Sequence, residues 1–384
     1  MAKINISELK ATISKLNLAI EKSKINPKSG WIELQSNGTD KLVVKAGNYD
    51  YYLEATVPID IEEGDSIHAT VTAETFVPLV SKLDDETVDI NERLNALIFT
   101  TAKSEYTFPI IKEMGKVKSI DTIKFNPTRC TRTKISGKSL ASVAETNAKG
   151  LVDAIFSKDI QQFVYVDNIG ALTFTDNIYV NDFEDKIEDE FKFLLNCTQA
   201  KLLKVFEGFD EVEIAVEGEE GSGGYSSSVK LQLTANDAIQ MTLITQSREM
   251  TDKFPSLRLR KLASAVSETH AIINKKEFEK ALARLMVFDK KFDITVLNYS
   301  KLVFSEDEVK LVSIKNNNYE VVPYVSHVNT SEHESIIRFA DIVNQLKAVQ
   351  SAEIDISYGD SPAIVINSDG LKQLIPEIRA VERN

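Results

Sequence analysis

The stretch THAIINKKEFEKALARLM, residues Thr269–Met286, contains the unit from which the fold can be built. It opens with an isoleucine-rich run, HAIIN, which predicts a strand. Asn274 stands where a helix N-cap is expected, and Glu277 follows three residues later, as in a capping box. Phe278, Leu282 and Leu285 then recur at spacings of three and four, so residues 274–291 are expected to form a helix with one face packed on a sheet.

The same order of elements recurs along the chain. Each copy starts with a strand and continues with a helix, three strands, a second helix and three more strands. Plausible caps at Ser7, Ser136 and Asn196 begin further helices, and Pro78 should leave one of them short or kinked. The expected helices are 7–24, 73–83, 136–150, 196–208, 274–291 and 338–351. Three copies of about 128 residues account for all 384 residues, so we predict an α+β chain of three domains, 1–125, 126–263 and 264–384.

Composition limits the class of protein. Hydrophobic residues make up 43% of the chain, which is enough for substantial cores. No apolar run reaches the roughly 18 residues that span a bilayer, and the N-terminus lacks the apolar core of a signal peptide, so a cytoplasmic location is expected. Cys130 and Cys197 are too few for a disulfide framework and stand in no metal-ligand spacing. We expect no metal and no cofactor.

Charge is distributed unevenly between helices and the rest of the chain. The formal net charge is -13, yet the six expected helices carry +8, which leaves -21 for the strands and loops. Such a chain would repel DNA over most of its surface and tolerate phosphates on its helices. Lysine is also a good helix former whose stem packs on apolar surface, and this simpler explanation stays open. The candidate DNA-facing residues are Lys10, Lys15, Lys22, Lys138, Lys149, Lys201, Lys204, Lys275, Lys276, Arg284, Arg338 and Lys347.

An enzyme is not expected. The histidines, His68, His270, His327 and His333, fall in no ligand or triad spacing, and the chain has no phosphate loop, GxSxG or HExxH motif. Two acidic runs, 182–190 and 217–224, could suggest carboxylate metal sites. They are better explained as solvated turns, because adjacent acids on a loop rarely converge on one ion.

Several segments resemble one family, the bacterial DNA polymerase III beta subunit, which is the replicative sliding clamp. In the first copy the resemblance lies in VPIDIEEGDSIHATVTAETFVPLVSKLDDETVDI, residues Val57–Ile90. In the second copy, TFTDNIYV (Thr173–Val180) is similar to the Thr-Asp-Gly-His segment of the family, and KFPSLRLR (Lys253–Arg260) is similar to its Phe-Pro-Asp-Tyr segment. In the third, INKKEFEKALARL and the closing LIPEIR match in the same order, so the resemblance spans the chain.

The resemblance implies the DNA clamp fold. Each domain would have two helices packed on antiparallel sheets, and a head-to-tail homodimer would form a ring with its helices around duplex DNA. The first domain of one subunit would meet the third domain of the next. Such a protein is a processivity factor without chemistry of its own, works at the nucleoid during replication, and tethers a replicative DNA polymerase and other partners, including the clamp loader, through short peptide motifs.

The resemblance also implies a partner-peptide pocket between the second and third domains. Its residues, transferred by motif with residues 255 and 259 placed on a strand, are Thr175, Asp176, Asn177, Ile178, Pro255, Leu259, Leu374, Ile375, Pro376 and Ile378. This chain departs from the family at Asn177, Ile178 and Glu377, where the family has Gly, His and an apolar residue. The departures are those of a divergent member, encoded by a bacterium or by a virus of bacteria. The rival hypothesis is a strand-rich structural or assembly protein with no DNA role.

Overall fold

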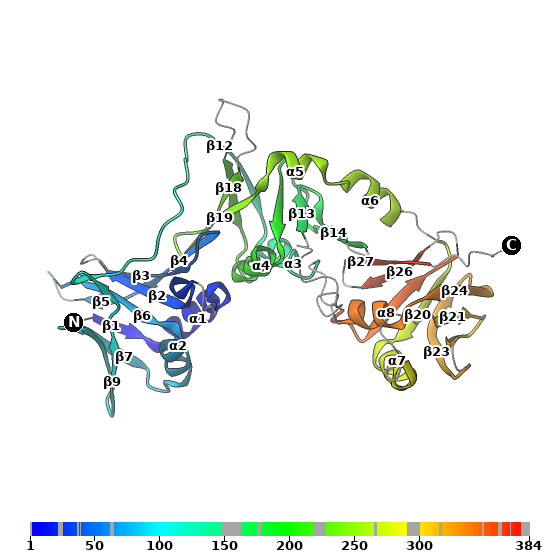
Figure 1. Cartoon of the computed structure of the whole chain (residues 1–384), viewed down its shortest axis with the longest axis horizontal. Coiled ribbons are helices and arrows are strands. Elements are labelled where there is room, and N and C mark those ends of the chain that lie inside the picture. The colour runs from blue at the N-terminus through cyan, green and yellow to red at the C-terminus, as the bar shows by residue number, and fades with distance from the viewer. Residues whose placement is uncertain are drawn as a thin grey trace. The chain divides into compact units, whose positions relative to one another are not determined.

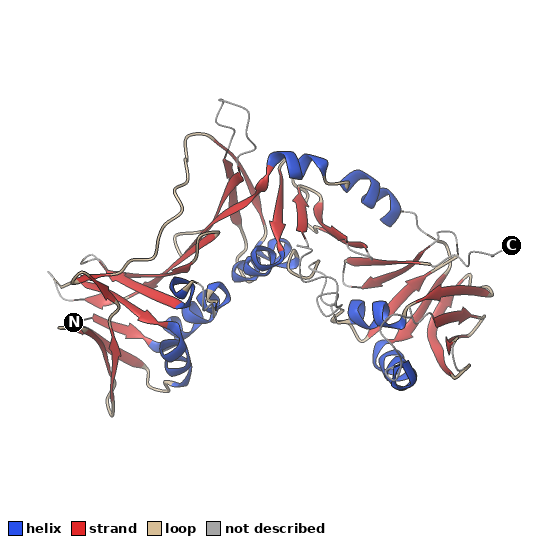
Figure 2. Ribbon diagram, viewed as in Figure 1, coloured by secondary structure: helices blue, strands red, loops and turns tan. Residues whose placement is uncertain are grey.

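The computed structural model describes residues 2–21, 26–36, 38, 40–61, 65–146, 163–174, 178–217, 228–264, 267–289, 300–314, 317–347, 349–359, 363–368 and 370–377. Short helices accompany extensive sheets (Figures 1 and 2). All strand pairings within the described part of the chain are antiparallel. The α+β class with antiparallel sheets is therefore confirmed. None of the helices in these ranges is both long and apolar enough to cross a lipid bilayer.

The chain forms two compact units that divide the middle repeat. The first unit contains residues 1–141 and 201–249, and the second contains residues 142–200 and 250–384. Each unit therefore combines one whole outer repeat with half of the middle one. The domain limits 1–125, 126–263 and 264–384 describe the sequence repeat and stay a prediction.

The first unit is built on two sheets. An eight-stranded sheet has the order β12-β17-β18-β19-β4-β3-β2-β6, and a five-stranded sheet has the order β5-β1-β7-β8-β9. Its strands are β1 (Ala2–Asn5), β2 (Trp31–Ser36), β3 (Lys41–Gly47), β4 (Tyr51–Pro58), β5 (Asp60–Ile61), β6 (Ile67–Thr72), β7 (Thr87–Arg93), β8 (Ala96–Thr100), β9 (Glu105–Pro109), β12 (Cys130–Ile135), β17 (Val212–Glu217), β18 (Ser228–Ala235) and β19 (Ile239–Ser247). A small hairpin joins β10 (Lys112–Glu113) to β11 (Lys116–Val117).

Two helices pack together in the core of the first repeat. Helix α1 (Ile6–Leu16) buries Ile6, Leu9, Ile13 and Leu16, and it contacts β4 and α2 (Ala73–Lys82). Phe76 of α2 makes edge-to-face contacts with Phe99 and Phe108, with ring centroids 5.5 and 5.2 Å away. These aromatic contacts fix α2 on the five-stranded sheet.

The second unit contains one twelve-stranded sheet with the order β16-β13-β14-β15-β27-β26-β25-β20-β23-β22-β21-β24. Its strands are β13 (Phe163–Asp167), β14 (Gly170–Phe174), β15 (Ile178–Asp182), β16 (Lys192–Asn196), β20 (His270–Asn274), β21 (Ser300–Phe304), β22 (Glu308–Ser313), β23 (Tyr319–Val328), β24 (His333–Ile337), β25 (Glu353–Ser357), β26 (Ala363–Ser368) and β27 (Leu371–Pro376). Helices α7 (Lys275–Asp289) and α8 (Phe339–Leu346) contact each other, and Phe278, Leu282 and Leu285 are buried in the core of the third repeat.

Helix starts follow the predicted chemistry with one exception. The Ser136, Asn196 and Asn274 side chains accept from the amides of Ser139 (3.1 Å), Gln199 (2.9 Å) and Glu277 (3.2 Å). Helix α3 (Gly137–Ser142) follows the first of these caps, and α4 (Cys197–Leu202) with the 3₁₀ turn Leu203–Phe206 follows the second. Ser7 was the wrong cap for α1. Asn5 caps that helix, and its Oδ1 accepts from the Ser7 and Glu8 amides at 2.9 and 3.3 Å.

Helix lengths differ from the prediction in several places. The helix expected over 7–24 ends at Leu16 and continues as a 3₁₀ turn to Ala19, and the one expected over 338–351 covers Phe339–Leu346. Helix α3 is shorter than the expected 136–150, of which residues 147–150 lie outside the described ranges. Helix α2 runs through Pro78 for ten residues and is not short. Pro78 lies on its exposed side, where water can satisfy the carbonyl that loses its amide partner.

Two hairpin turns of the first unit place large apolar residues in the left-handed backbone region. Leu94 has φ 54° and is 94% exposed, and Met114 has φ 50° and is 99% exposed. A left-handed conformation costs a residue with a Cβ roughly 1–2 kcal/mol, and asparagine or glycine is preferred there. The Lys112 ammonium joins the two turns, because it donates to the Leu94 carbonyl and to Asn95 Oδ1, each at 2.9 Å.

Replacing Leu94 with asparagine should stabilise the first unit. The Leu94→Asn change relieves backbone strain and removes almost no buried surface, so the free energy of unfolding should rise by about 1 kcal/mol. Trp31, the single tryptophan of the chain, lies in this unit and reports its unfolding in urea by fluorescence. Tyr49→Asn, at another exposed position with ordinary φ, is the control and should change little; a destabilised Leu94→Asn protein would contradict the strain argument.

Candidate functional site

In the first unit, predicted DNA-facing residues lie on helices that meet around residues 206–209. The Lys15 ammonium of α1 lies 4.0 Å from the centre of the Phe209 ring, and the Gly137 amide of α3 donates to the Phe209 carbonyl at 2.9 Å. A Cβ at Gly137 would stand 2.1 Å from the Phe206 carbonyl oxygen, so only glycine permits this approach. Lys138 follows that glycine, and Lys201 and Lys204 lie on α4 and its 3₁₀ extension.

These first-unit residues differ in exposure. Lys138 and Lys201 are exposed, whereas Lys10, Lys15 and Lys204 are half-buried. Burial lowers the pKa of Lys15 below its ordinary value, because the charged ammonium loses hydration. Lys22 and Lys149 lie outside the described residues.

In the second unit, most of the predicted residues bind to protein groups. The Arg284 guanidinium donates Nε and Nη2 to the two carboxylate oxygens of Glu320, both at 2.7 Å, which lowers the pKa of Glu320. The Lys275 ammonium donates to the Val349 carbonyl at 2.7 Å, and Arg338 Nε donates to Asp341 at 2.8 Å.

Two further second-unit residues are more accessible. Lys276 on α7 and Lys347 at the end of α8 are both exposed. Within the described ranges, the Lys276 side chain forms no hydrogen bond or ion pair, so among the second-unit residues it is well placed to contact an external phosphate.

Two residues of the predicted peptide pocket, Ile178 and Leu374, lie on an apolar row that crosses four strands of the second unit. Residues directly opposite one another are Phe174 and Ile178 in β14 and β15, Ile178 and Leu374 in β15 and β27, and Leu374 and Val365 in β27 and β26. The structure therefore places Ile178 and Leu374, which are 196 positions apart in sequence, in one cross-strand pair. Ile375 points to the other face of the sheet, where it joins the core of the third repeat.

The segment containing Pro255 and Leu259 is a helix and not the predicted strand. Helix α6 (Ser256–Ala263) follows α5 (Arg248–Lys253), starts after Pro255, and packs on β15 and β27. Leu259 and Ala263, four residues apart, are buried, and Pro255 is exposed. A helix was missed because SLRLRKLA alternates leucine and basic residues like a strand, while its buried positions follow helical spacing.

An ion-pair network fixes α6 to the sheet. Arg260 Nη2 donates to Asp167 of β13 at 2.6 Å, and Nη1 donates to Asp182 of β15 at 2.8 Å. Beside it, the Phe254 ring stacks on Tyr165 with centroids 4.9 Å apart and contacts Phe174 at 5.5 Å. The helix position is therefore set by both charge pairing and aromatic packing.

The departure from the family pattern at Glu377 has a local explanation. Its carboxylate accepts from Ser335 Oγ at 2.6 Å and lies 3.1 Å from His333 Nε2, both on β24. An acid at this position links the end of β27 to β24, a distant strand of the same unit. The neighbouring Pro376 is exposed. Thr175, Asp176, Asn177 and Ile378 lie outside the described residues.

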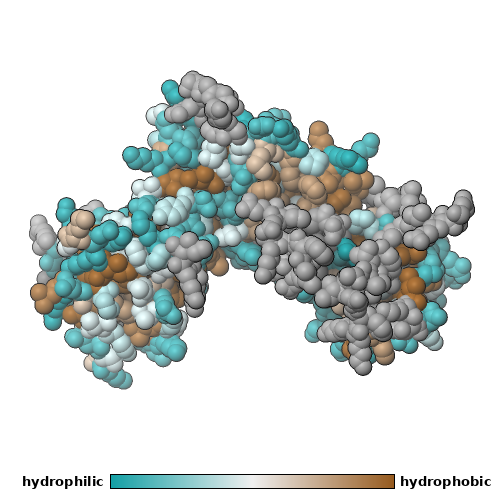
Figure 3. Space-filling model, viewed as in Figure 1, coloured by the Kyte–Doolittle hydropathy of each residue, from teal (hydrophilic) through white to brown (hydrophobic). Residues whose placement is uncertain are grey.

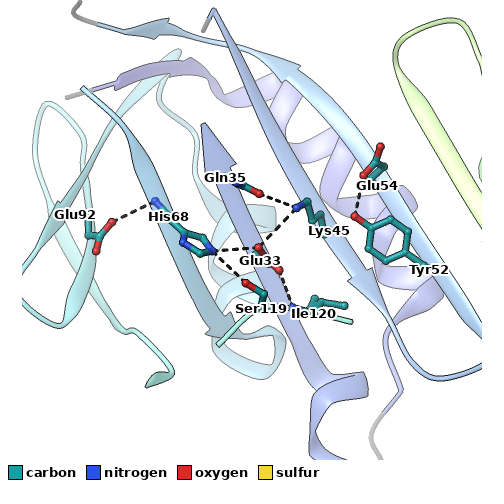
Figure 4. Close-up of polar contacts among 9 residues, drawn as sticks. All are labelled: Glu33, Gln35, Lys45, Tyr52, Glu54, His68, Glu92, Ser119 and Ile120. Atoms are coloured by element: carbon teal, nitrogen blue, oxygen red, sulfur yellow. Dashed lines mark hydrogen bonds and ion pairs between the residues drawn. The ribbon is translucent and has the colours of Figure 1, made fainter. Parts of the chain in front are cut away.

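A buried carboxylate that the sequence did not reveal holds the segment after β11 (Figure 4). Glu33 of β2 is 1% exposed, and its Oε2 accepts from the Ile120 amide at 2.7 Å. Its Oε1 lies 3.2 Å from His68 Nε2 and 3.7 Å from the Lys45 ammonium. His68 Nε2 also lies 3.4 Å from Ser119 Oγ. Because the carboxylate binds residues from three other parts of the first unit, it acts as a structural anchor.

The remaining histidines also lie beside acids. His270 Nδ1 is 3.0 Å from Asp355, and His327 Nε2 is 3.7 Å from Asp307. Across the described part of the chain, no three His, Cys, Asp or Glu side chains gather as metal ligands. The acidic run 182–190 is described, whereas most of 217–224 is not.

The fold matches solved structures over nearly its full length. The beta subunit of DNA polymerase III from Thermotoga maritima superposes with a TM-score of 0.72 at 16% identity and covers 99% of this chain and 100% of its own. The beta subunit from Streptococcus pyogenes gives 0.72 at 15% identity with the same coverage, and the Borrelia burgdorferi protein gives 0.73 at 15% identity, covering 98% and 99%.

The chain has the fold of the bacterial DNA polymerase III beta subunits. No family model matches the sequence, and no curated protein is similar enough to count as a relative. The clamp architecture expected from the short motifs is therefore confirmed at the level of fold, where 15–16% identity is compatible with a divergent chain.

Removing the Arg260 side-chain charge should loosen α6. In Arg260→Met, Asp167 keeps a buried charge without its cation, so the free energy of unfolding of the second unit should fall by about 2–3 kcal/mol. Urea unfolding followed by far-UV circular dichroism, together with hydrogen exchange of the α6 amides, measures this loss. Arg258→Met on the exposed side of the same helix is the matched control and should stay within about 0.5 kcal/mol of the wild type. Equal effects in both variants would contradict the anchoring role of Arg260.

Proposed function

We propose that the chain is a DNA sliding clamp, a processivity factor that encircles duplex DNA and tethers a DNA polymerase. The observation that carries this proposal is the match over the whole chain to structures described as DNA polymerase III beta subunits and DNA polymerase sliding clamps. The charge distribution supports it, because helices α1, α3, α4 and α7 each carry a net +1 in a chain whose net charge is -13. A ring holds DNA topologically, so a net charge of -13 is compatible with DNA binding.

The ring would be a head-to-tail homodimer, in which the first repeat of one copy meets the third repeat of the other. Two features of the single chain are suited to such contacts. Strand β9 lies at the edge of its five-stranded sheet, and Val287 and Phe288 near the end of α7 are 60% and 48% exposed. Open strand edges and exposed apolar residues are both covered readily by a second copy.

The clamp would contact DNA loosely and perform no catalysis. Lysines without interleaved aromatics bind phosphates without reading sequence, which permits sliding. Polymerase and clamp loader would bind through short peptides at the open end of the apolar row beside α6, where Phe174 is exposed and Ile178 is half-buried, whereas Leu374 and Val365 are buried beneath. Such a protein would act in the cytoplasm at the nucleoid.

The experiment that tests the proposal measures topological retention. The protein is first sized by light scattering coupled to gel filtration, where a dimer of about twice 42.9 kDa is expected. It is then incubated with nicked circular plasmid, and retention is compared before and after the plasmid is linearised. A clamp stays on the circle and leaves the linear DNA. A stable monomer, or equal retention on both forms, would favour the strand-rich structural protein instead.

Reversing the charge of two exposed lysines should weaken retention of the protein on DNA without affecting its fold. Lys201 and Lys276 are exposed and make no ion pair with other described residues, so Lys201→Glu with Lys276→Glu removes two candidate phosphate contacts. The slope of log affinity against log salt should become shallower by about one unit per lysine. Lys275 and Arg284 are less informative, because protein groups already bind them. An unchanged salt slope in a folded dimer would remove these lysines from the DNA interface.

A further inference from the structure

Helix α6 has an outward face that the packing of the second unit leaves open. On a helical wheel Leu257, Lys261, Arg258 and Leu262 follow one another along one side, and all four are exposed, Leu257 by 85%. The opposite side carries Leu259 and Ala263, which are buried. Two leucines therefore border two cations on a face that contributes nothing to the core.

The cations on this face differ from Arg260. Arg260 is bound by Asp167 and Asp182, whereas within the described ranges no carboxylate pairs with Arg258 or Lys261. Helix α6 contains three basic residues and no acidic one, in a chain with 58 acidic and 45 basic residues. The outward face is thus a local positive site on a negative molecule, and its charge is available for an external partner.

The face is also rigid and continuous with apolar surface. Arg260 and the Phe254–Tyr165 stack hold the helix, so a partner would bind an ordered surface at little entropic cost. Exposed Phe174 contacts Phe254 just before the helix, and it begins the apolar row proposed to hold partner peptides. Figure 3 shows apolar side chains gathered around α5 and α6 on this side of the molecule.

We propose that the outward face of α6 binds an acidic, leucine- or phenylalanine-containing segment of the partner protein. The apolar residues of that segment pack on Leu257 and Leu262, while its carboxylates pair with Arg258 and Lys261. The inference rests on the proposed function, because it assigns a charge preference to the partner peptides and extends their binding surface beyond the strand row. It makes Arg258 and Lys261 specificity-determining residues.

A display library of random twelve-residue peptides, selected on the full-length protein, tests the proposal. The selected peptides should be enriched in Asp and Glu next to Leu or Phe. By fluorescence anisotropy, Arg258→Glu with Lys261→Glu should weaken the strongest peptide about tenfold at low salt and less at high salt. Lys186→Glu with Lys280→Glu, two exposed lysines of the same unit, changes the total charge equally and should have little effect. A peptide with its acids replaced by lysines should prefer the variant reversed at 258 and 261.

Other outcomes separate the two proposals. Selected peptides that lack acids, or that bind the 258/261 variant normally, overturn the inference; if Ile178→Asp still abolishes their binding, the pocket proposed for the clamp stands. Failure of any peptide to bind overturns both. Loss of duplex DNA binding, or of binding to phosphatidylglycerol vesicles, in the 258/261 variant without an effect on peptides would assign the face to DNA or to a membrane and overturn the inference.

Discussion

Strand pairing between repeats is the interaction on which the rest of the structure depends. Strand β4 of the first repeat pairs with β19 of the middle repeat, and β27 of the third repeat pairs with β15. Each pairing satisfies backbone amides and carbonyls that would otherwise line an open edge, and it turns short sheets into continuous ones. The middle repeat is divided between the two units as a result. The apolar row of residues 174, 178, 374 and 365 exists only because β15 of the middle repeat pairs with β27 of the third repeat.

Much of this architecture follows from local sequence patterns. The residues from Asn274 onward determine the cap, the apolar face and the length of this helix, so the observed α7 agrees closely with the predicted helix. Repetition of that pattern then predicts the class and the order of elements. The pairing of strands from different repeats does not follow, because alternating strands carry no information on which distant edge they meet.

The candidate site could be predicted from the sequence only in part, for the same reason. Ile178 and Leu374 could be assigned to one pocket through a family resemblance, but nothing local to either residue says that they lie directly opposite each other. Helix α6 was missed because leucine and basic residues alternate in its sequence. Its two ion pairs could not be predicted either, because they join residues 78 and 93 positions apart. Glu33 was not singled out from the sequence, because the segment that covers it lies 87 positions away.

The pairing of β4 with β19 also affects how the chain folds during translation. About 180 residues separate the end of β4 at Pro58 from the start of β19 at Ile239. At synthesis rates of roughly 5–20 residues per second, the β4 edge waits about 10–40 s on the ribosome for its partner. During that time it is an open template on which a neighbouring nascent chain can pair. Glu54, half-buried within this strand, is a charged residue of the type that opposes such pairing.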